Sequence, residues 1–291
     1  MRIAVTGRSG QVVSAMSERA SHGIELVTLG RPKFDLADAG TVGPAIAAAA
    51  PDLIVSAAAY TAVDKAESEP DLARAVNGVA PGLIGEAAAA LGIPVIHLST
   101  DYVFAGDKPA PYVETDMTGP ATTYGRTKLE GEERLAAATD NHLILRTAWV
   151  YSPFGGNFVK TMLRLAATRD EVRVVADQRG CPTSALDIAD AIFSLAPRLS
   201  DGEAPRGVFH LVGSGETDWA SFAAAIFEES SALGGPSARV VPITTAEYPT
   251  PAHRPANSRL STGKLHTSYG LALPQWRASL RETVGRLLSG R

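Results

Sequence analysis

The chain has 291 residues, of which 45% are hydrophobic and 20% charged, a composition typical of a globular protein that can bury a substantial core. A formal net charge of -4 lacks the positive field that attracts polyanions, so we predict no nucleic-acid partner. The single cysteine, Cys181, excludes an internal disulfide framework, and because no apolar run is long enough to span a bilayer, no membrane partner is predicted.

Short apolar runs alternate with alanine-rich segments from the first residues onward. Met1 is followed at once by a strand-like run instead of a signal sequence, so a cytoplasmic protein is expected. We predict strands at 2–6, 24–29, 52–58, 93–99 and 142–147, and helices between them at 11–20, 41–49, 81–91 and 124–137. Apolar strands separated by helices predict an α/β fold, a doubly wound parallel sheet of Rossmann type.

Beyond residue 150 the pattern loosens into shorter elements interrupted by glycine, proline and polar turns. We interpret residues 151–291 as mainly a smaller, substrate-binding C-terminal lobe, and residues 1–150 as the cofactor-binding domain. Later elements, at about 172–212, are expected to return to the main sheet. A final helix is predicted at 275–288, where it would serve packing.

The turn after the first predicted strand reads TGRSGQVV. In doubly wound folds ligands bind beyond the carboxyl ends of the strands. Gly7 would permit the tight turn there, and Gly10 would let the backbone approach a pyrophosphate at the start of the following helix. Val13 replaces the third glycine of the dinucleotide fingerprint, which we expect to move the helix outward slightly while leaving the phosphate site intact. The turn therefore predicts a dinucleotide cofactor.

The end of the second strand discriminates between the two nicotinamide dinucleotides. Sites for NAD usually place an acid about 20 residues beyond the glycines, where it binds the ribose 2′-hydroxyl. Here Gly30 and Arg31 follow the strand, and a guanidinium suits a 2′-phosphate, with Arg8 able to reinforce it. We predict NADPH, with NADH as the alternative cofactor; a solvent-facing Arg31 without a ligand is the alternative for that residue.

Small and hydroxyl-bearing residues follow the third and fourth strands. Ala57, Ala58 and Ala59 would let a flat cofactor pass close over the sheet. Ser99 and Thr100 would point into the same crevice.

Tyr124 and Lys128 stand four residues apart in a predicted helix, which places both side chains on one face. An ordinary solvated face would show the same spacing. A phenol has an unperturbed pKa of about 10, and a neighbouring ammonium favours the phenolate, so Lys128 would lower the pKa of Tyr124. The pair predicts a general acid for ketone reduction, in which charge develops on the carbonyl oxygen.

Together these segments resemble one known family. The resemblance runs nearly from end to end, through TGRSGQV, AAAYTAVDKAESEP, STDYVF, YGRTKLEGE, RTAWVY, NFVKTMLRLA, DQRGCPTS, YPTPAHRPANSRL and LPQWRASL. In them the chain is similar to the extended short-chain dehydrogenase/reductases and, within these, to the family of dTDP-4-dehydrorhamnose reductases. The glycine turn and Tyr-x-x-x-Lys belong to the whole superfamily, whereas TAVDKAESEP, RTAWVY and RPANSRL are specific to the reductases.

The resemblance implies an enzyme that uses NADPH to reduce the C4 keto group of dTDP-4-dehydro-β-L-rhamnose to dTDP-β-L-rhamnose. It implies Tyr124 as general acid, Lys128 on the nicotinamide ribose and Thr100 as the catalytic hydroxyl. The cofactor contacts, including those argued above, are Gly7, Arg8, Gly10, Gln11, Val12, Arg31, Asp35, Leu36, Ala57, Ala58, Ala59, Tyr60, Thr61, Tyr124 and Lys128. The substrate contacts are Thr100, Asp101 and Trp149, with Arg254 and Asn257 as candidates for the diphosphate or sugar. Core packing is the alternative for Trp149.

The six histidines are scattered without ligand spacing, so no metal site is predicted. Some relatives bridge subunits through a metal ion held by a carboxylate; Leu186 stands in that place here, and a monomer or weak homodimer is expected. Cys181, with no histidine or basic motif beside it, is predicted to be structural.

Two other functions stay open. One is a neighbouring nucleotide-deoxysugar 4-ketoreductase or epimerase of the same fold. The other is a catalytically idle NADP-binding subunit, of the kind that accompanies methionine adenosyltransferase. An intact set of Thr100, Tyr124 and Lys128 argues against the idle subunit.

Overall fold

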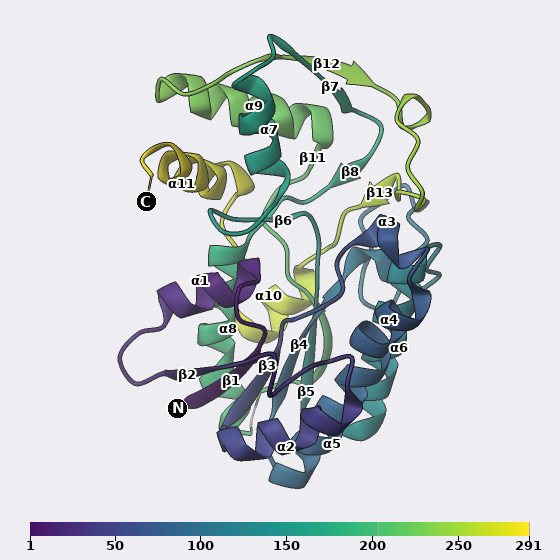
Figure 1. The fold of residues 1–291 in the computed structure, drawn as a ribbon, viewed down its shortest axis with the longest axis vertical. Coiled ribbons are helices and arrows are strands. Elements are labelled where there is room, and N and C mark those ends of the chain that lie inside the picture. Colours follow the sequence, from purple (N-terminus) through teal and green to yellow (C-terminus); the bar gives the residue numbers. More distant parts are fainter. Residues whose placement is uncertain (203, 291) are drawn as a thin grey trace.

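The computed structural model describes residues 1–202 and 204–290. Its centre is a six-stranded parallel sheet in the order β10-β5-β4-β3-β1-β2, with helices on both faces (Figure 1). A smaller lobe lies beyond one end of this sheet, at the top of the same view. The predicted class, a doubly wound α/β fold, is confirmed.

The main sheet consists of β1 (Arg2–Thr6), β2 (Glu25–Leu29), β3 (Leu53–Ser56), β4 (Val95–Thr100), β5 (His142–Thr147) and β10 (Gly207–His210). One face packs against α1 (Gln11–Arg19), α8 (Ala185–Ser200) and α10 (Gly263–Tyr269), and the other against α2 (Ala39–Ala49), α5 (Ala80–Leu91) and α6 (Thr123–Ala138). Each strand and helix predicted in residues 1–150 begins and ends within two residues of these bounds. β2 differs in being half-exposed, because it lies at the edge of the sheet.

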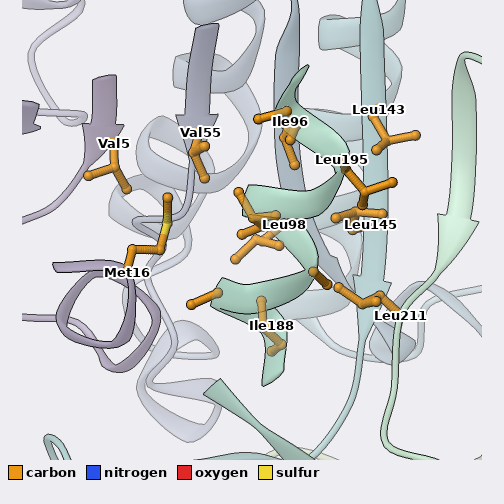
Figure 2. Close-up of a cluster of buried hydrophobic side chains, with 14 of the residues drawn as sticks. Val5, Met16, Val55, Ile96, Leu98, Leu143, Leu145, Ile188, Leu195 and Leu211 are labelled. Atoms are coloured by element: carbon orange, nitrogen blue, oxygen red, sulfur yellow. The ribbon is translucent and has the colours of Figure 1, made fainter. Parts of the chain in front are cut away.

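Side chains of the inner strands alternate between two cores. Val5, Val55 and Ile96 face the core that also receives Met16 of α1 and Ile188 of α8 (Figure 2). Residues one position away along the same strands, such as Ala4, Ile54 and Val95, face the core under α2 and α5. Because both faces are buried, the strands are apolar without alternation, and each fully buried aliphatic side chain contributes about 1.5–3 kcal/mol.

The segment between β3 and α5 was not predicted. It contains α3 (Val63–Ala66), α4 (Pro70–Arg74) and a π-helical turn at Ala75–Val79 that runs directly into α5. Four- and five-residue helices are too short to produce a recognisable hydrophobic period, so the pattern gives no signal for them.

The smaller lobe is built mainly from residues after the fifth strand. It comprises β6 (Val150–Tyr151), α7 (Phe158–Ala166), β7 (Glu171–Val175), β8 (Arg179–Gly180), β9 (Thr183–Ser184), β11 (Thr217–Asp218), α9 (Trp219–Ala232), β12 (Arg239–Ile243), β13 (Asn257–Ser258) and α11 (Trp276–Leu288). β7 pairs with β12 in this lobe, whereas α8, β10 and α10 pack in the main sheet domain. The lobe has its own core, centred on Phe222 and Trp276.

Among the described residues, no helix combines the length and apolar character required to cross a membrane.

Candidate active site

A cleft of about 820 Å³ opens where β4 and β5 end and the smaller lobe begins. Thr100, Asp101 and Tyr124 line it from the sheet side, and Trp149 and Trp219 line it from the lobe. Its place beyond the carboxyl ends of parallel strands is the one in which this class of fold binds ligands, and its size is within the range of ligand sites.

Tyr124 lies in the first turn of α6, whose start is fixed by three hydrogen bonds. The Thr122 hydroxyl accepts from the Gly125 amide at 3.0 Å, which caps the helix. Glu67 accepts from the Thr123 amide at 2.8 Å and from its hydroxyl at 2.7 Å. Glu67 lies in the TAVDKAESEP motif but was not predicted, because its partner is 56 residues away in the sequence.

Burial raises the pKa of the Tyr124 phenol well above its ordinary value, and the nearby Thr100 hydroxyl opposes this shift only in part. The expected lowering of this pKa by Lys128 is not found. The Lys128 Nζ points to the sheet instead, where it donates to the Leu98 carbonyl at 2.7 Å and lies 3.2 Å from the His97 Nε2. Tyr124 is therefore a neutral phenol at ordinary pH, which is the protonation state that a proton donor requires.

Lys128 is itself buried, with 2% of its surface exposed. Burial lowers the pKa of Lys128 to about 8, against the opposing effect of the Glu132 carboxylate. Glu132 in turn is held by Arg146 in a buried ion pair of 2.6 Å and by the Ser99 hydroxyl. Ser99, which was expected to point into the crevice, lines the cleft but commits its hydroxyl to Glu132.

Two buried oxygen atoms in the cleft have no hydrogen-bond partner among residues 1–202 and 204–290: Oδ2 of Asp101 and Oγ1 of Thr147. Oδ1 of Asp101 accepts from the Thr100 hydroxyl at 3.0 Å. Burial raises the pKa of Asp101 to about 6, against the opposing effect of the nearby Ser258 and Thr100 hydroxyls. Because an unpaired buried polar atom is destabilising, both oxygens are suited to a polar ligand. Thr147 was not predicted, and its position follows only from the pairing of β5 with β4 beside Thr100.

The lobe side of the cleft is aromatic. Trp149 stacks on Trp219 with ring centroids 3.6 Å apart, and Phe158 lies 4.5 Å from the Trp219 ring. The Trp149 ring also covers the backbone of Gly180, where an added Cβ would lie 2.3 Å from the indole. Trp149 thus packs within the lobe and also lines the cleft. Trp219 and Phe158 were not predicted, because nothing local marks two aromatics of separate helices as neighbours.

The glycine turn connects the ends of three strands. Gly7 has a φ of +101°, a conformation that favours glycine, and its amide donates to the Leu29 carbonyl at 2.6 Å. The Thr6 hydroxyl accepts from the amides of Ala57 and Ala58, each at 2.9 Å. Val13 is buried, and a Cβ at Gly7 would meet its side chain at 3.3 Å, so the valine fills the space beneath the turn.

The helix that follows, α1, has Gly10 as its N-cap and no side-chain cap. Its first amides are therefore available to an anion, as a dinucleotide diphosphate requires. Val12 packs against the core. The Gln11 Oε1 accepts from the Ser152 hydroxyl at 2.8 Å and from the Asn157 amide at 3.0 Å, which ties the turn to the smaller lobe.

Two arginines meet at the end of β2. The Arg8 side chain crosses Gly30, at which an added Cβ would lie 2.8 Å from the Arg8 Cγ. Arg31 follows with 78% of its side chain exposed, and its Nε lies 3.3 Å from the Asp35 Oδ2. Asp35 also accepts from the Ala37 amide, and the neighbouring Leu36 packs against the α2 side of the core. Both arginines thus lie at the end of β2, and their contact with a cofactor 2′-phosphate stays a prediction.

The stretch Ala59 to Thr61 follows β3. The Tyr60 amide donates to the Asn77 Oδ1 at 2.8 Å, and Asn77 donates back to the Tyr60 carbonyl at 3.0 Å. The Tyr60 hydroxyl bonds Glu69, and Thr61 lines the cleft. Asn77 was not predicted, because it lies on the π-helical turn and acts on a loop 17 residues away.

Arg254 reaches the cleft and Asn257 does not. The Arg254 Nη2 lies 2.6 Å from Asp64 Oδ2, and its Nη1 donates to the Tyr102 hydroxyl at 3.3 Å. Asn257, predicted as a second ligand, lies outside the residues that line the cleft. Its amide donates to the carbonyls of Lys108 and Ala110 and accepts from the Arg259 amide, so its polar atoms are committed to the loop. The structure thus does not bring Asn257 to the cleft.

Among residues 1–202 and 204–290, no three side chains of His, Cys, Asp or Glu come close enough together to hold a metal ion. Leu186 is buried in the core beneath the main sheet. Cys181 is a buried free thiol, and burial raises its pKa to about 11. The expectation of a monomer or weak homodimer stays a prediction.

The model of the family described as RmlD substrate binding domain matches residues 1–289. A dTDP-4-dehydrorhamnose reductase of Sinorhizobium fredii (strain NBRC 101917 / NGR234) is 58% identical over 290 residues, which cover 99% of this chain and 98% of that relative. A crystal structure of a dTDP-4-dehydrorhamnose reductase from Clostridium acetobutylicum ATCC 824 is similar at a TM-score of 0.92 and 35% identity, covering 99% of this chain and 100% of that one. The crystal structure of the dTDP-4-dehydrorhamnose reductase from Bacillus anthracis str. Ames in complex with NADP is similar at a TM-score of 0.90 and 32% identity. The match covers 97% of this chain and 98% of that one.

Proposed function

Because the chain belongs to the RmlD substrate binding domain family, we propose that it reduces the C4 keto group of dTDP-4-dehydro-β-L-rhamnose with NADPH. The product is then dTDP-β-L-rhamnose. The names of its relatives support this substrate. The observation in the molecule that carries the proposal is the meeting of Tyr124 and Thr100 in one cleft, beside two oxygens without a hydrogen-bond partner in the described part of the chain.

The cofactor supplies the hydride when bound, and the ends of β1, β2 and β3 provide the residues that would hold it. The turn from Gly7 to Gly10 and the first amides of α1 fit a diphosphate. Arg8 and Arg31 fit a 2′-phosphate. The remaining proposed contacts are Gln11, Val12, Asp35, Leu36, Ala57, Ala58, Ala59, Tyr60 and Thr61, together with Tyr124 and Lys128.

Tyr124 is the proposed general acid. Its phenol keeps its proton until negative charge develops on the sugar C4 oxygen, and it then donates that proton to the oxygen. The Thr100 hydroxyl orients this oxygen by a second hydrogen bond, for which it turns its single proton away from Asp101 Oδ1. Lys128, a buried cation one helical turn from Tyr124, binds the nicotinamide ribose.

The sugar and its diphosphate occupy the rest of the cleft. Oδ2 of Asp101 and Oγ1 of Thr147 bind sugar hydroxyls, which satisfies the two buried oxygens. Trp149 offers its apolar face to the deoxysugar. Arg254 binds the diphosphate, for which it must share or release its ion pair with Asp64.

For the domain organisation we propose residues 1–150 as the cofactor-binding domain, joined by later elements within about 172–212, and residues 151–291 as mainly the substrate-binding lobe. The place of β10 in the main sheet supports the return of the chain. β7, at the start of that later segment, pairs instead with β12.

The decisive experiment follows NADPH oxidation by the purified chain in the presence of dTDP-4-dehydro-β-L-rhamnose, with the product identified by chromatography. Wild type should oxidise NADPH only when the keto sugar is present. Tyr124→Phe should lower kcat by about 10²–10⁴-fold, the usual contribution of a general acid. Tyr269→Phe, which removes a buried tyrosine hydroxyl outside the cleft, is the matched control.

Failure of wild type to oxidise NADPH with this sugar would exclude the proposed reaction. Activity only with a different nucleotide-linked keto sugar would assign the chain to a neighbouring reductase. An unchanged kcat in Tyr124→Phe would remove the general-acid assignment alone.

The preference for NADPH is tested at Arg31. Arg31→Ala should raise the Kd for NADPH about 10- to 150-fold, because a hydrogen bond to a charged group contributes about 1.5–3 kcal/mol, and should leave the Kd for NADH almost unchanged. Lys33→Ala, an exposed cation two residues away, controls for general electrostatics. Fluorescence titration of both dinucleotides gives these constants, and equal weakening of both by Arg31→Ala would contradict the assignment.

A further inference from the structure

A line of buried polar side chains runs from α6 into the sheet beneath the cleft. The Lys128 Nζ lies 3.2 Å from the His97 Nε2, and the His97 Nδ1 lies 2.9 Å from the Ser56 Oγ. His97 has 1% of its surface exposed and Ser56 has 2%. The chemistry proposed above uses Lys128 but gives no role to the other two residues.

The hydrogen bonds in this line define the state of the imidazole. An ammonium group can only donate, so the His97 Nε2 must be an unprotonated acceptor. The remaining imidazole proton then lies on Nδ1 and donates to the Ser56 hydroxyl. Burial and the Lys128 charge both lower the pKa of His97 well below its ordinary value, which agrees with a neutral ring.

The same contacts define the direction of the Lys128 ammonium. Of its three N–H bonds, one donates to the Leu98 carbonyl at 2.7 Å and a second to the His97 Nε2. No acceptor for the third is found among residues 1–202 and 204–290. A long, flexible side chain is thereby held in one orientation by two acceptors of β4.

We propose that His97 is a positioning residue for the reaction: as a neutral acceptor, held in one tautomer by Ser56, it keeps Lys128 protonated and directs its remaining N–H to the active site. This inference rests on the proposed function, since it concerns the cation beside Tyr124. It adds a requirement that the Tyr-x-x-x-Lys motif does not contain, because His97 is 31 residues upstream on another element.

The groups that face this line come from α6, β5 and β3. Glu132, one turn beyond Lys128 on α6, raises the pKa of Lys128, and its charge is balanced by Arg146 of β5. His142 of β5 acts on His97 through charge alone. β3 contributes Ser56, which carries no charge. Substitution of His97 therefore removes one acceptor without removing the neighbouring ion pair.

The pH dependence of the reaction distinguishes positioning from a merely structural role. The pKa of Tyr124 is raised, so the first of the two residues to lose its proton above neutral pH is Lys128, at about pH 8. The alkaline decline of kcat/KM should follow that loss. Without the His97 acceptor the charged ammonium is less stabilised, so the decline should move to lower pH by about one unit.

The test compares alkaline pH profiles of kcat/KM in wild type, His97→Phe, His97→Gln and His142→Phe. His97→Phe should shift the decline to lower pH, and His97→Gln, whose side-chain carbonyl can accept in place of Nε2, should restore it. His142→Phe removes a buried histidine that does not contact Lys128 and should leave the profile unchanged. An unshifted profile in active His97→Phe overturns the inference, whereas inactive wild type overturns the proposed function.

A second measurement needs neither a variant nor turnover. NMR of the wild-type protein labelled with ¹⁵N at histidine should show a His97 ring that stays neutral, with its proton on Nδ1, from about pH 5 to pH 9. A ring that titrates near its ordinary pKa of about 6.5, or that carries its proton on Nε2, overturns the inference even if His97→Phe does not fold.

Discussion

Asp101 is a buried carboxylate in the candidate active site, and its environment disfavours its charge. Only 6% of its surface is exposed, and its Oδ2 has no partner in the part of the chain that the structure describes. Burial raises its pKa to about 6 from an ordinary value of 3.8. Such a residue is suited to binding a ligand. As long as no ligand is bound, it is expected to destabilise the fold.

The sign of this effect follows from proton linkage. Between about pH 4 and pH 6 the folded protein retains the Asp101 proton that the unfolded chain has lost, so the contribution of Asp101 to stability falls as pH rises. Asp101→Asn should therefore raise the free energy of unfolding by up to about 3 kcal/mol at pH 8, but by only about 1 kcal/mol at pH 4.5.

Urea unfolding at the two pH values measures the difference. Asp140→Asn, at an exposed aspartate, should show no such dependence. A gain for Asp101→Asn that is the same at both pH values would mean that Asp101 is not a strained carboxylate. Loss of substrate affinity in the same variant is expected from its proposed role.

The Tyr-x-x-x-Lys spacing illustrates what one residue pair can and cannot reveal. Tyr124 and Lys128 do share a face of α6, as the spacing predicts, and both are buried. The direction of the Lys128 ammonium is set by His97 and the Leu98 carbonyl, which belong to β4. The sequence pattern therefore locates the pair, but the pKa of each group depends on neighbours that the pattern does not contain.

At the scale of elements, α6 depends on close approach to the segment before α5. An added Cβ at Gly131 would lie 2.0 Å from the Asn77 carbonyl oxygen, and one at Gly125 would lie 2.2 Å from that of Tyr102. From sequence alone Gly131 appears only to weaken the helix. In the fold it lets α6 contact the π-helical turn, so that Asn77 can hold both Tyr60 and Thr127.

Gly131→Ala should lower the free energy of unfolding by about 1–3 kcal/mol, because a methyl group at this site must displace backbone. It should also lower activity, since α6 carries Tyr124. Gly43→Ala is the matched control: Gly43 lies inside α2 with open space at its Cβ position, so the change should stabilise by about 0.5–1 kcal/mol. Thermal and urea unfolding of the two variants measure these changes in stability. Equal effects of the two substitutions would contradict the prediction.

At the scale of the whole molecule, the cleft exists because two packed units meet at it. The sheet side contributes Thr100 and Tyr124, and the smaller lobe contributes Trp149, which packs against the core of that lobe. Gln11 contacts Ser152 across the boundary, and Asp64 accepts from Arg254 there. These contacts hold the glycine turn and the loop at Arg254 in place across the boundary between the sheet domain and the smaller lobe.

The accuracy of prediction differs between the two units for a physical reason. The inner strands of the main sheet are buried on both faces, so each is a continuous apolar run that is visible in sequence. In the smaller lobe the strands β6, β8, β9, β11 and β13 have two residues each, and no such run exists. Trp219 and Phe158 therefore could not be assigned to the cleft in advance, and Asn257, which was assigned to it, lies outside its lining.

The sequence by itself determined the α/β class, the positions of the main strands, the glycine turn and the Tyr124–Lys128 pair, because each depends on residues within a few positions of one another. The tertiary structure alone decided which polar atoms remain unpaired in the cleft, which acceptors hold Lys128, and how burial shifts the pKa values of Tyr124 and Asp101. Burial and hydrogen bonding depend on segments that are distant in sequence and become neighbours only when the chain folds.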